Sequence, residues 1–208
     1  MTSIISYIQK KQKRLILLIS IVLIAGIGLI LWKYQQERRN QHAQSELFQA
    51  VYQFEEGDYN KALQGDDIHA GFLEIIKNYR FTKAANLAHF YAGVCYMHQE
   101  SYTEAIQHLG HFKSNDLLLQ ARAWSLIGDG LVEQKAYSEA TKYYLKAAEY
   151  KSNESFSPTY LVKAALAYEA LKDYKNALQC YQKIVKAYNK SSLYTEASRQ
   201  VSRLEALL

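Results

Sequence analysis

The chain has 208 residues with one proline and nine glycines, and 49% of its residues are apolar. So little proline favours helix almost throughout, and no alternating apolar pattern bounded by turn residues predicts strands. The formal net charge of +5 does not indicate nucleic-acid binding, because seven basic residues but only one acid, Glu37, precede residue 40, leaving 18 basic against 19 acidic residues beyond.

The N-terminal region combines a short polar tail, residues 1–14, with an uncharged apolar stretch from Leu15 to Trp32. These 18 residues fall within the range of about 17 to 25 that spans a bilayer. A cleaved signal peptide has a shorter apolar region of about 7 to 15 residues that ends in small residues. Here Leu29 to Trp32 continues beyond the small cluster Ala25–Gly28. We therefore expect an uncleaved, single-pass membrane anchor at residues 15–32.

The charges that flank the anchor predict its orientation. Four basic residues precede the apolar stretch and three follow it, and Glu37 offsets one of those three. The positive-inside rule then places the N-terminus in the cytoplasm by a narrow margin. We expect the remainder on the extracytoplasmic side of the bacterial inner membrane, in the periplasm of a Gram-negative cell. The reversed topology, with a cytoplasmic C-terminal region, stays open.

Residues 33–85 are predicted to hold a helix that continues from the anchor and a degenerate first helix pair. No glycine or proline lies between residues 29 and 56, and apolar residues recur there at helical spacing. A turn is expected at Glu56–Tyr59, with Asp58 as the cap of the next helix. After an insertion at Gly65–Asp67, the second helix is expected to resume at Phe72–Tyr79.

The stretch from Trp124 to Ala147 follows a pattern typical of a repeated helix pair. Gly128 lets the partner helix approach closely, and the ring of Tyr144 fills the space beside it. The same template recurs on both sides, with Gly93 and Ala165 in the small position. The copies start at residues 86, 121 and 158, which are 35 and 37 residues apart. This pattern resembles the tetratricopeptide repeat, whose period is about 34 residues.

Together, the expected anchor and the repeat resemblance predict an all-α fold: a single N-terminal transmembrane helix followed by a tetratricopeptide-repeat α-solenoid of about four helix pairs. After the degenerate pair, repeats are expected at residues 86–120, 121–157 and 158–190. Residues 191–208 are expected to form a capping helix that shields the last repeat from water. Cys95 and Cys180 lie two repeats apart, too far for a disulfide, so both are predicted to be free and buried.

The inner face of such a solenoid is the expected site of protein binding. The resemblance assigns positions 2, 5, 9, 12 and 13 of each repeat to this face. They form an aromatic, apolar half beside a charged half, which suits an amphipathic helix or an extended hydrophobic peptide. Alternatively, the long first helix or the inserted loop covers the apolar half, which is then ordinary core. The predicted groove residues are Phe48, Val51, Phe54, Leu87, Phe90, Val94, Met97, His98, Arg122, Ser125, Asp129, Val132, Glu133, Val162, Leu166 and Glu169.

Catalysis and metal binding are not expected. No nucleophile has an identifiable base and orienting group, and Gly128–Gly130 lacks the lysine of a phosphate loop. Cys95, His98, His108 and His111 belong to one repeat, but their spacing fits no zinc pattern. The sequence therefore predicts a non-enzymatic protein without cofactors, whose partners are proteins and the membrane, not nucleic acids or small-molecule substrates.

In its order of tail, anchor and repeats, the chain resembles the ancillary subunits of the SecYEG translocon. These form a bacterial family of membrane-anchored tetratricopeptide proteins. The resemblance covers roughly residues 10–208 and is most specific at Gly71–Ile76 and Thr82–Ala88. It implies a chaperone adaptor that binds the translocon through its anchor. Its repeats would engage a membrane-anchored periplasmic chaperone or emerging chains. The alternative is a structural scaffold for another envelope assembly, such as the outer-membrane insertion or division machinery.

Overall fold

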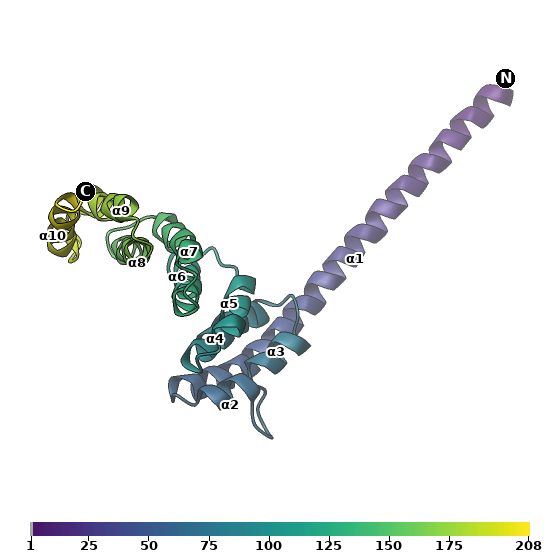
Figure 1. Cartoon of the computed structure of the whole chain (residues 1–208). Coiled ribbons are helices and arrows are strands. Elements are labelled where there is room, and N and C mark those ends of the chain that lie inside the picture. The colour runs from purple at the N-terminus through teal and green to yellow at the C-terminus, as the bar shows by residue number, and fades with distance from the viewer. Residues whose placement is uncertain (1) are drawn as a thin grey trace.

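The computed structural model describes residues 2–208, with side chains from residue 20 onward. This part of the chain forms ten α-helices, and the fold is all-α, as predicted, with an arrangement consistent with a tetratricopeptide-repeat solenoid (Figure 1). The helices are α1 (Thr2–Glu55), α2 (Tyr59–Gln64), α3 (Phe72–Asn78), α4 (Lys83–His98), α5 (Tyr102–His111), α6 (Leu117–Glu133), α7 (Tyr137–Glu149), α8 (Ser157–Ala170), α9 (Tyr174–Ala187) and α10 (Tyr194–Glu205).

Helix α1 continues without a break from the N-terminal segment into the first repeat, as the absence of glycine and proline after residue 28 predicts. Its purple N-terminal half stands free as a rod, whereas its C-terminal half packs on α2, α3 and α4 (Figure 1). Ala43, Leu47 and Ala50 form the buried face of the packed half at helical spacing. One helix thus belongs to the solenoid at one end and leaves it at the other.

The predicted anchor, Leu15 to Trp32, lies only partly within the described side chains, because residues 15–19 fall outside them. Among the side chains described, from residue 20 on, no helix combines the length and the apolar character that a bilayer crossing requires. The large apolar side chains between Ile21 and Trp32 are 54 to 70% exposed. The anchor therefore stays a prediction.

The helix pairs are joined by turns of one kind. In each turn one residue has a left-handed backbone, and the next N–H donates to a carbonyl five residues earlier, as in a Schellman motif. The left-handed residues are Gly57 (φ 82°), Glu100 (59°), Lys135 (60°) and Lys172 (61°). The donor–acceptor pairs are Asp58–Gln53, Ser101–Tyr96, Ala136–Leu131 and Asp173–Tyr168. The repeat predicted from side-chain pattern is therefore also a repeat of backbone geometry.

The positions predicted to be small lie at contacts between helices. An added Cβ would lie 2.5 Å from Leu109 Cγ at Gly93, and 2.5 Å from Tyr144 Cε1 at Gly128. Ala165 is fully buried. A larger side chain at these positions would push the second helix of the pair away from the first.

The two ends of the solenoid also follow the predictions. Asp58 caps α2 by accepting from the N–H of Lys61, and the insertion before α3 closes through a single bridge between Gly65 and Ala70. At the other end, α10 buries Ala197 and Leu204 against the last repeat. The two cysteines are free and buried, as predicted.

Candidate protein-binding groove

The aromatic half of the predicted groove is packed as core. The ring of Phe54 lies 5.6 Å from Tyr59, 6.5 Å from Phe72 and 5.2 Å from Tyr91, measured between centroids. Phe90 is buried, with its ring 5.2 Å from that of Phe112. Val94 is buried in the same cluster as Phe90. The structure therefore places Phe90 and Val94 in the interior, where the alternative interpretation expects them, and Phe54 half-buried against the aromatic core.

The other predicted residues of this half are more accessible. Val51, Leu87 and Met97 are half-buried. Phe48 is exposed on α1, and the ring of His98 stacks on Tyr59 with a centroid distance of 4.0 Å. These side chains lie at the border of the aromatic core. They do not form one continuous apolar surface with it.

The charged half is brought together by helices α6 and α8. Arg122, Ser125 and Asp129 occupy successive turns of one face of α6, because they are three and four residues apart. Across from them, α8 contributes Lys163 to a hollow of about 290 Å³. The remaining walls are largely apolar and comprise Leu118, Leu126, Phe156, Thr159 and Tyr160.

A hydrogen-bonded network crosses the bottom of this hollow. Lys163 Nζ lies 2.8 and 2.7 Å from the two carboxylate oxygens of Asp129 and donates to Ser125 Oγ at 3.2 Å. The hydroxyl of Tyr144, on α7, donates to Asp129 Oδ1 at 2.7 Å. Burial, and then the Asp129 charge, raise the pKa of Tyr144 well above its ordinary value, so the hydroxyl stays a donor. Charge-assisted bonds of this kind hold their partners in one geometry.

A second hollow, of about 270 Å³, lies on the other side of Lys163. Val132 and Leu166 line it, and Leu166 is 56% exposed. The inner face of α6 and α8 therefore offers two adjacent hollows that share Lys163, with Asp129 lining the first and Tyr144 the second. Apolar walls around a fixed ion pair suit a peptide that buries side chains on both sides.

The last predicted residues lie at the edges of this surface. Glu133 is exposed and Val162 is half-buried. Glu169 is committed to the C-terminal cap, because it accepts from the Tyr181 hydroxyl at 3.3 Å and pairs with Arg203 of α10. The groove thus ends before the capping helix.

Lys163 is the residue of the groove that the sequence did not identify. It lies at the sixth position of its repeat, outside the positions assigned to the inner face. The signal was Asp129, a carboxylate on the inner face of a largely apolar helix, which needs a partner when it is partly buried. That partner comes from the next repeat, 34 residues later.

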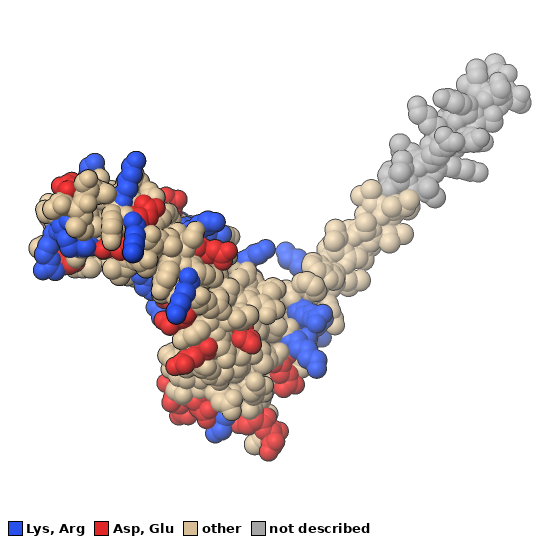
Figure 2. Space-filling view, viewed as in Figure 1, with Lys and Arg blue, Asp and Glu red and all other residues tan. Residues whose placement is uncertain are grey.

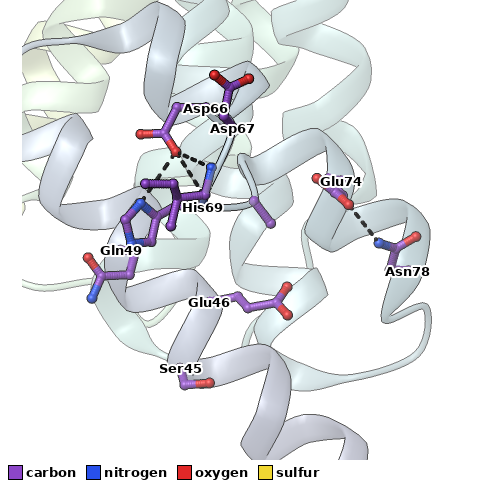
Figure 3. A pocket seen from close by; sticks show the side chains of 10 residues that line it. Ser45, Glu46, Gln49, Asp66, Asp67, His69, Glu74 and Asn78 are labelled. Carbon is purple, nitrogen blue, oxygen red and sulfur yellow. Dashed lines mark hydrogen bonds and ion pairs between the residues drawn. The ribbon is translucent and has the colours of Figure 1, made fainter.

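A larger hollow, of about 360 Å³, lies between α1 and the loop that joins α2 to α3. Figure 3 shows that its walls are polar and that Asp66 turns back on its own loop. Asp66 Oδ1 accepts from the N–H groups of Ile68 and His69 at 2.9 and 2.8 Å, and these bonds lower the pKa of Asp66. Among the described residues, no group of three or more His, Cys, Asp or Glu is arranged to hold a metal. We therefore attribute the polar side chains of this hollow to the hydrogen bonds that shape the α2–α3 loop.

Three histidines meet between α4 and α5. His89 Nδ1 lies 3.1 Å from His108 Nδ1, and the ring of His111 stacks on His89 with centroids 5.1 Å apart. Burial, then His108, then His111 lower the pKa of His89 to about 4. The sequence singled out His108 and His111 but missed His89, because only the pairing of the two helices brings it to them.

The comparisons with known proteins agree with the helix-pair architecture. The sequence model of the tetratricopeptide repeat family matches residues 160–191, which cover most of α8 and α9. No curated protein matches the chain. A tetratricopeptide repeat is therefore present, and all-helical folds of this kind are typically protein-binding scaffolds without enzymatic activity.

Proposed function

We propose that the chain is a membrane-anchored protein-binding adaptor of the bacterial inner membrane, and an ancillary subunit of the SecYEG translocon. The observation that carries the binding function is the pair of hollows on the inner face of α6 and α8, divided by the ion pair of Lys163 and Asp129. The repeat matched at residues 160–191 includes Lys163, which lines both hollows.

The groove favours a peptide with apolar side chains and at least one polar group near its middle. Leu118, Phe156 and Leu166 are exposed apolar side chains along its length. Arg122, also exposed, adds a cation to one hollow. A segment of an emerging chain or of a chaperone has this mixed character, and concave repeat surfaces bind extended segments of this kind.

The free half of α1 supports the anchor. Apolar side chains more than half exposed from Ile21 to Trp32 form a larger apolar surface than a monomer in water commonly exposes. A bilayer covers such a surface on every side of a helix, whereas a groove on another protein covers one side. The flanking charges support a cytoplasmic N-terminus and periplasmic repeats.

The translocon assignment is supported by the sequence resemblance, which extends over both anchor and repeats. In this proposal the anchor contacts the Sec channel, and the repeats bind a membrane-anchored periplasmic chaperone or emerging chains. Affinity purification of the full chain in mild detergent tests it. We expect the Sec channel to co-purify. If another envelope assembly co-purifies and the Sec channel does not, the scaffold alternative replaces the translocon assignment.

Photocrosslinking in living cells tests the groove separately. A crosslinking residue at Arg122 or Leu166 is expected to capture a protein, and one at Lys142, exposed on α7, to capture much less. Phe90 and Val94 are unsuitable positions because they are buried. Equal capture from all three positions would remove the support for the inner face.

A further inference from the structure

The turn between α3 and α4 displays a phenylalanine in an unusual backbone conformation. Phe81 has a φ of 67° and is 92% exposed. A positive φ is rare for a bulky L-residue, because the side chain crowds the backbone, and it persists where the surrounding structure enforces it. Unlike the left-handed residues of the repeat turns, Phe81 follows a second helix and presents a large ring to solvent.

Contacts with α1 set the direction of this turn. Three hydrogen bonds hold it: Arg39 Nη2 to Asn78 O (2.8 Å), Gln36 Nε2 to Arg80 O (3.5 Å) and Ala84 N to Asn40 Oδ1 (3.1 Å). Of the three partners on α1, the one that meets Arg80 lies nearest the N-terminus. The tip of the turn, at Arg80 and Phe81, is therefore directed toward the free rod.

The tip lies close to the level at which the exposed apolar segment ends. Gln36 is one helical turn beyond Trp32, which corresponds to about 6 Å along the helix axis. The interfacial layer of a bilayer is about 5 to 8 Å thick on each side, and aromatic rings concentrate there. With the apolar rod in a membrane, the turn that carries Phe81 lies at about the depth of this layer, because Arg80 meets Gln36.

Basic side chains surround the tip. They are exposed and comprise Lys33, Arg38 and Arg39 of α1 with Lys77, Arg80 and Lys83 of α3, the turn and α4. The Arg38 guanidinium lies 5.4 Å from the centroid of the Tyr34 ring. The acidic residues of segments 33–39 and 72–83 are Glu37 and Glu74, and Glu46 of α1 also reaches the turn by accepting from the Tyr79 hydroxyl at 2.6 Å. Figure 2 shows lysine and arginine side chains gathered where the rod joins the folded body, with acidic side chains directly below them and along the lower edge of the body.

We propose that the Phe81 turn is a second membrane contact, in which the ring enters the interfacial layer and the surrounding basic residues bind anionic phospholipid headgroups. This rests on the proposed anchor and adds a function to it. A single helix leaves the solenoid free to rotate about the membrane normal and to tilt. A second contact beside the helix fixes which face of the solenoid is turned toward the membrane.

The test uses the full chain reconstituted in bilayers, with a nitroxide attached at position 81 through Phe81→Cys. Cys95 and Cys180 are buried and do not compete for the label. Collision with a water-soluble nickel chelate and with oxygen reports the depth of the nitroxide. The matched control is Ile68→Cys, because Ile68 is 84% exposed in the loop between α2 and α3, which projects away from the rod in Figure 1. A third probe, through Ile24→Cys, reports the anchor.

In bilayers that contain phosphatidylglycerol, we expect the probe at 81 to be shielded from the nickel chelate and the probe at 68 to stay accessible. Each basic residue near an anionic surface favours the docked state roughly fivefold. Bilayers of phosphatidylcholine alone, or the additional change Arg80→Glu, are therefore expected to return the probe at 81 toward the accessibility of the probe at 68.

The outcomes separate this inference from the anchor. If the probe at 24 is buried in lipid and the probe at 81 is as accessible as that at 68, the anchor stands and the second contact is rejected. If the probe at 81 becomes shielded only in native membranes, and not in pure lipid, it contacts a protein and the lipid proposal is rejected. If the probe at 24 is accessible to water, both the anchor and this inference are rejected.

Discussion

The first and second halves of the solenoid use the same repeat template and differ in what covers its inner face. In the first half, the aromatic rings of Phe54, Phe72 and Tyr91 pack together, because α1 and the inserted α2–α3 segment bring them into one cluster. In the second half, α6 and α8 leave two hollows around Lys163. A shared backbone repeat therefore supports a closed core at the end packed against α1 and an open groove at the other.

The largest effect is expected from removing an aromatic ring in the closed half. Phe72 is fully buried, and Phe72→Ala is expected to lower the free energy of unfolding by about 3 to 5 kcal/mol. Leu166→Ala in the open half is expected to change it by less than about 0.5 kcal/mol, because this side chain is largely exposed. Urea unfolding followed by circular dichroism measures both. Similar losses for the two variants would contradict the division into closed and open halves.

A smaller effect is expected where helices approach closely. Gly128→Ala would place a methyl group against the ring of Tyr144 and cost about 1 to 3 kcal/mol. The matched change Gly110→Ala in α5 meets nothing within 4 Å and is expected to stabilise by up to about 1 kcal/mol, because glycine is a poor helix former. Thermal unfolding compares the two. A stabilised Gly128→Ala variant would show that the ring moves aside freely.

Removing the Lys163 cation is expected to lower the stability of the fold less than the preceding changes, but to weaken ligand binding. Lys163→Met leaves Asp129 with fewer hydrogen-bond donors and is expected to lower the free energy of unfolding by about 1 kcal/mol. The loss is small because both side chains are about one-third exposed and water screens the pair. Crosslinking from Arg122 is expected to fall in this variant, and Lys142→Met serves as the control. Adding Asp129→Asn to Lys163→Met is expected to recover stability without recovering capture. Capture unaffected by Lys163→Met would place the ligand elsewhere.

The last effect appears only on acidification and is expected from the histidine cluster in the closed half. The folded pKa of His89, about 4, lies below its unfolded value of about 6.5. The unfolded chain therefore binds more protons between these values, so stability falls as the pH drops from 6.5 to 4, and this group adds no further loss below. His89→Gln is expected to flatten the dependence of the melting temperature on pH in this window. His42→Gln, at a histidine that is exposed, is the control; an equal flattening by both changes would reject the cluster as the cause.

Local pattern was enough to predict the helices, their pairing and the small residues at 93, 128 and 165. These features depend on residues close in the chain: the period of apolar residues, the caps and the turns between paired helices. For the same reason, the continuity of α1 and the second helix after the insertion could be predicted from the sequence.

Contacts between distant segments decided the remainder. Whether Phe54 and Phe90 face a ligand or the core depends on what α1 and the inserted loop cover. The pairing of Lys163 with Asp129 joins neighbouring repeats, and the bond from Gln36 to the Arg80 carbonyl joins α1 to the α3–α4 turn. Burial and ion pairing are properties of surfaces that meet in three dimensions, so the periodicity of one segment predicts which face is inward but not what lies opposite it.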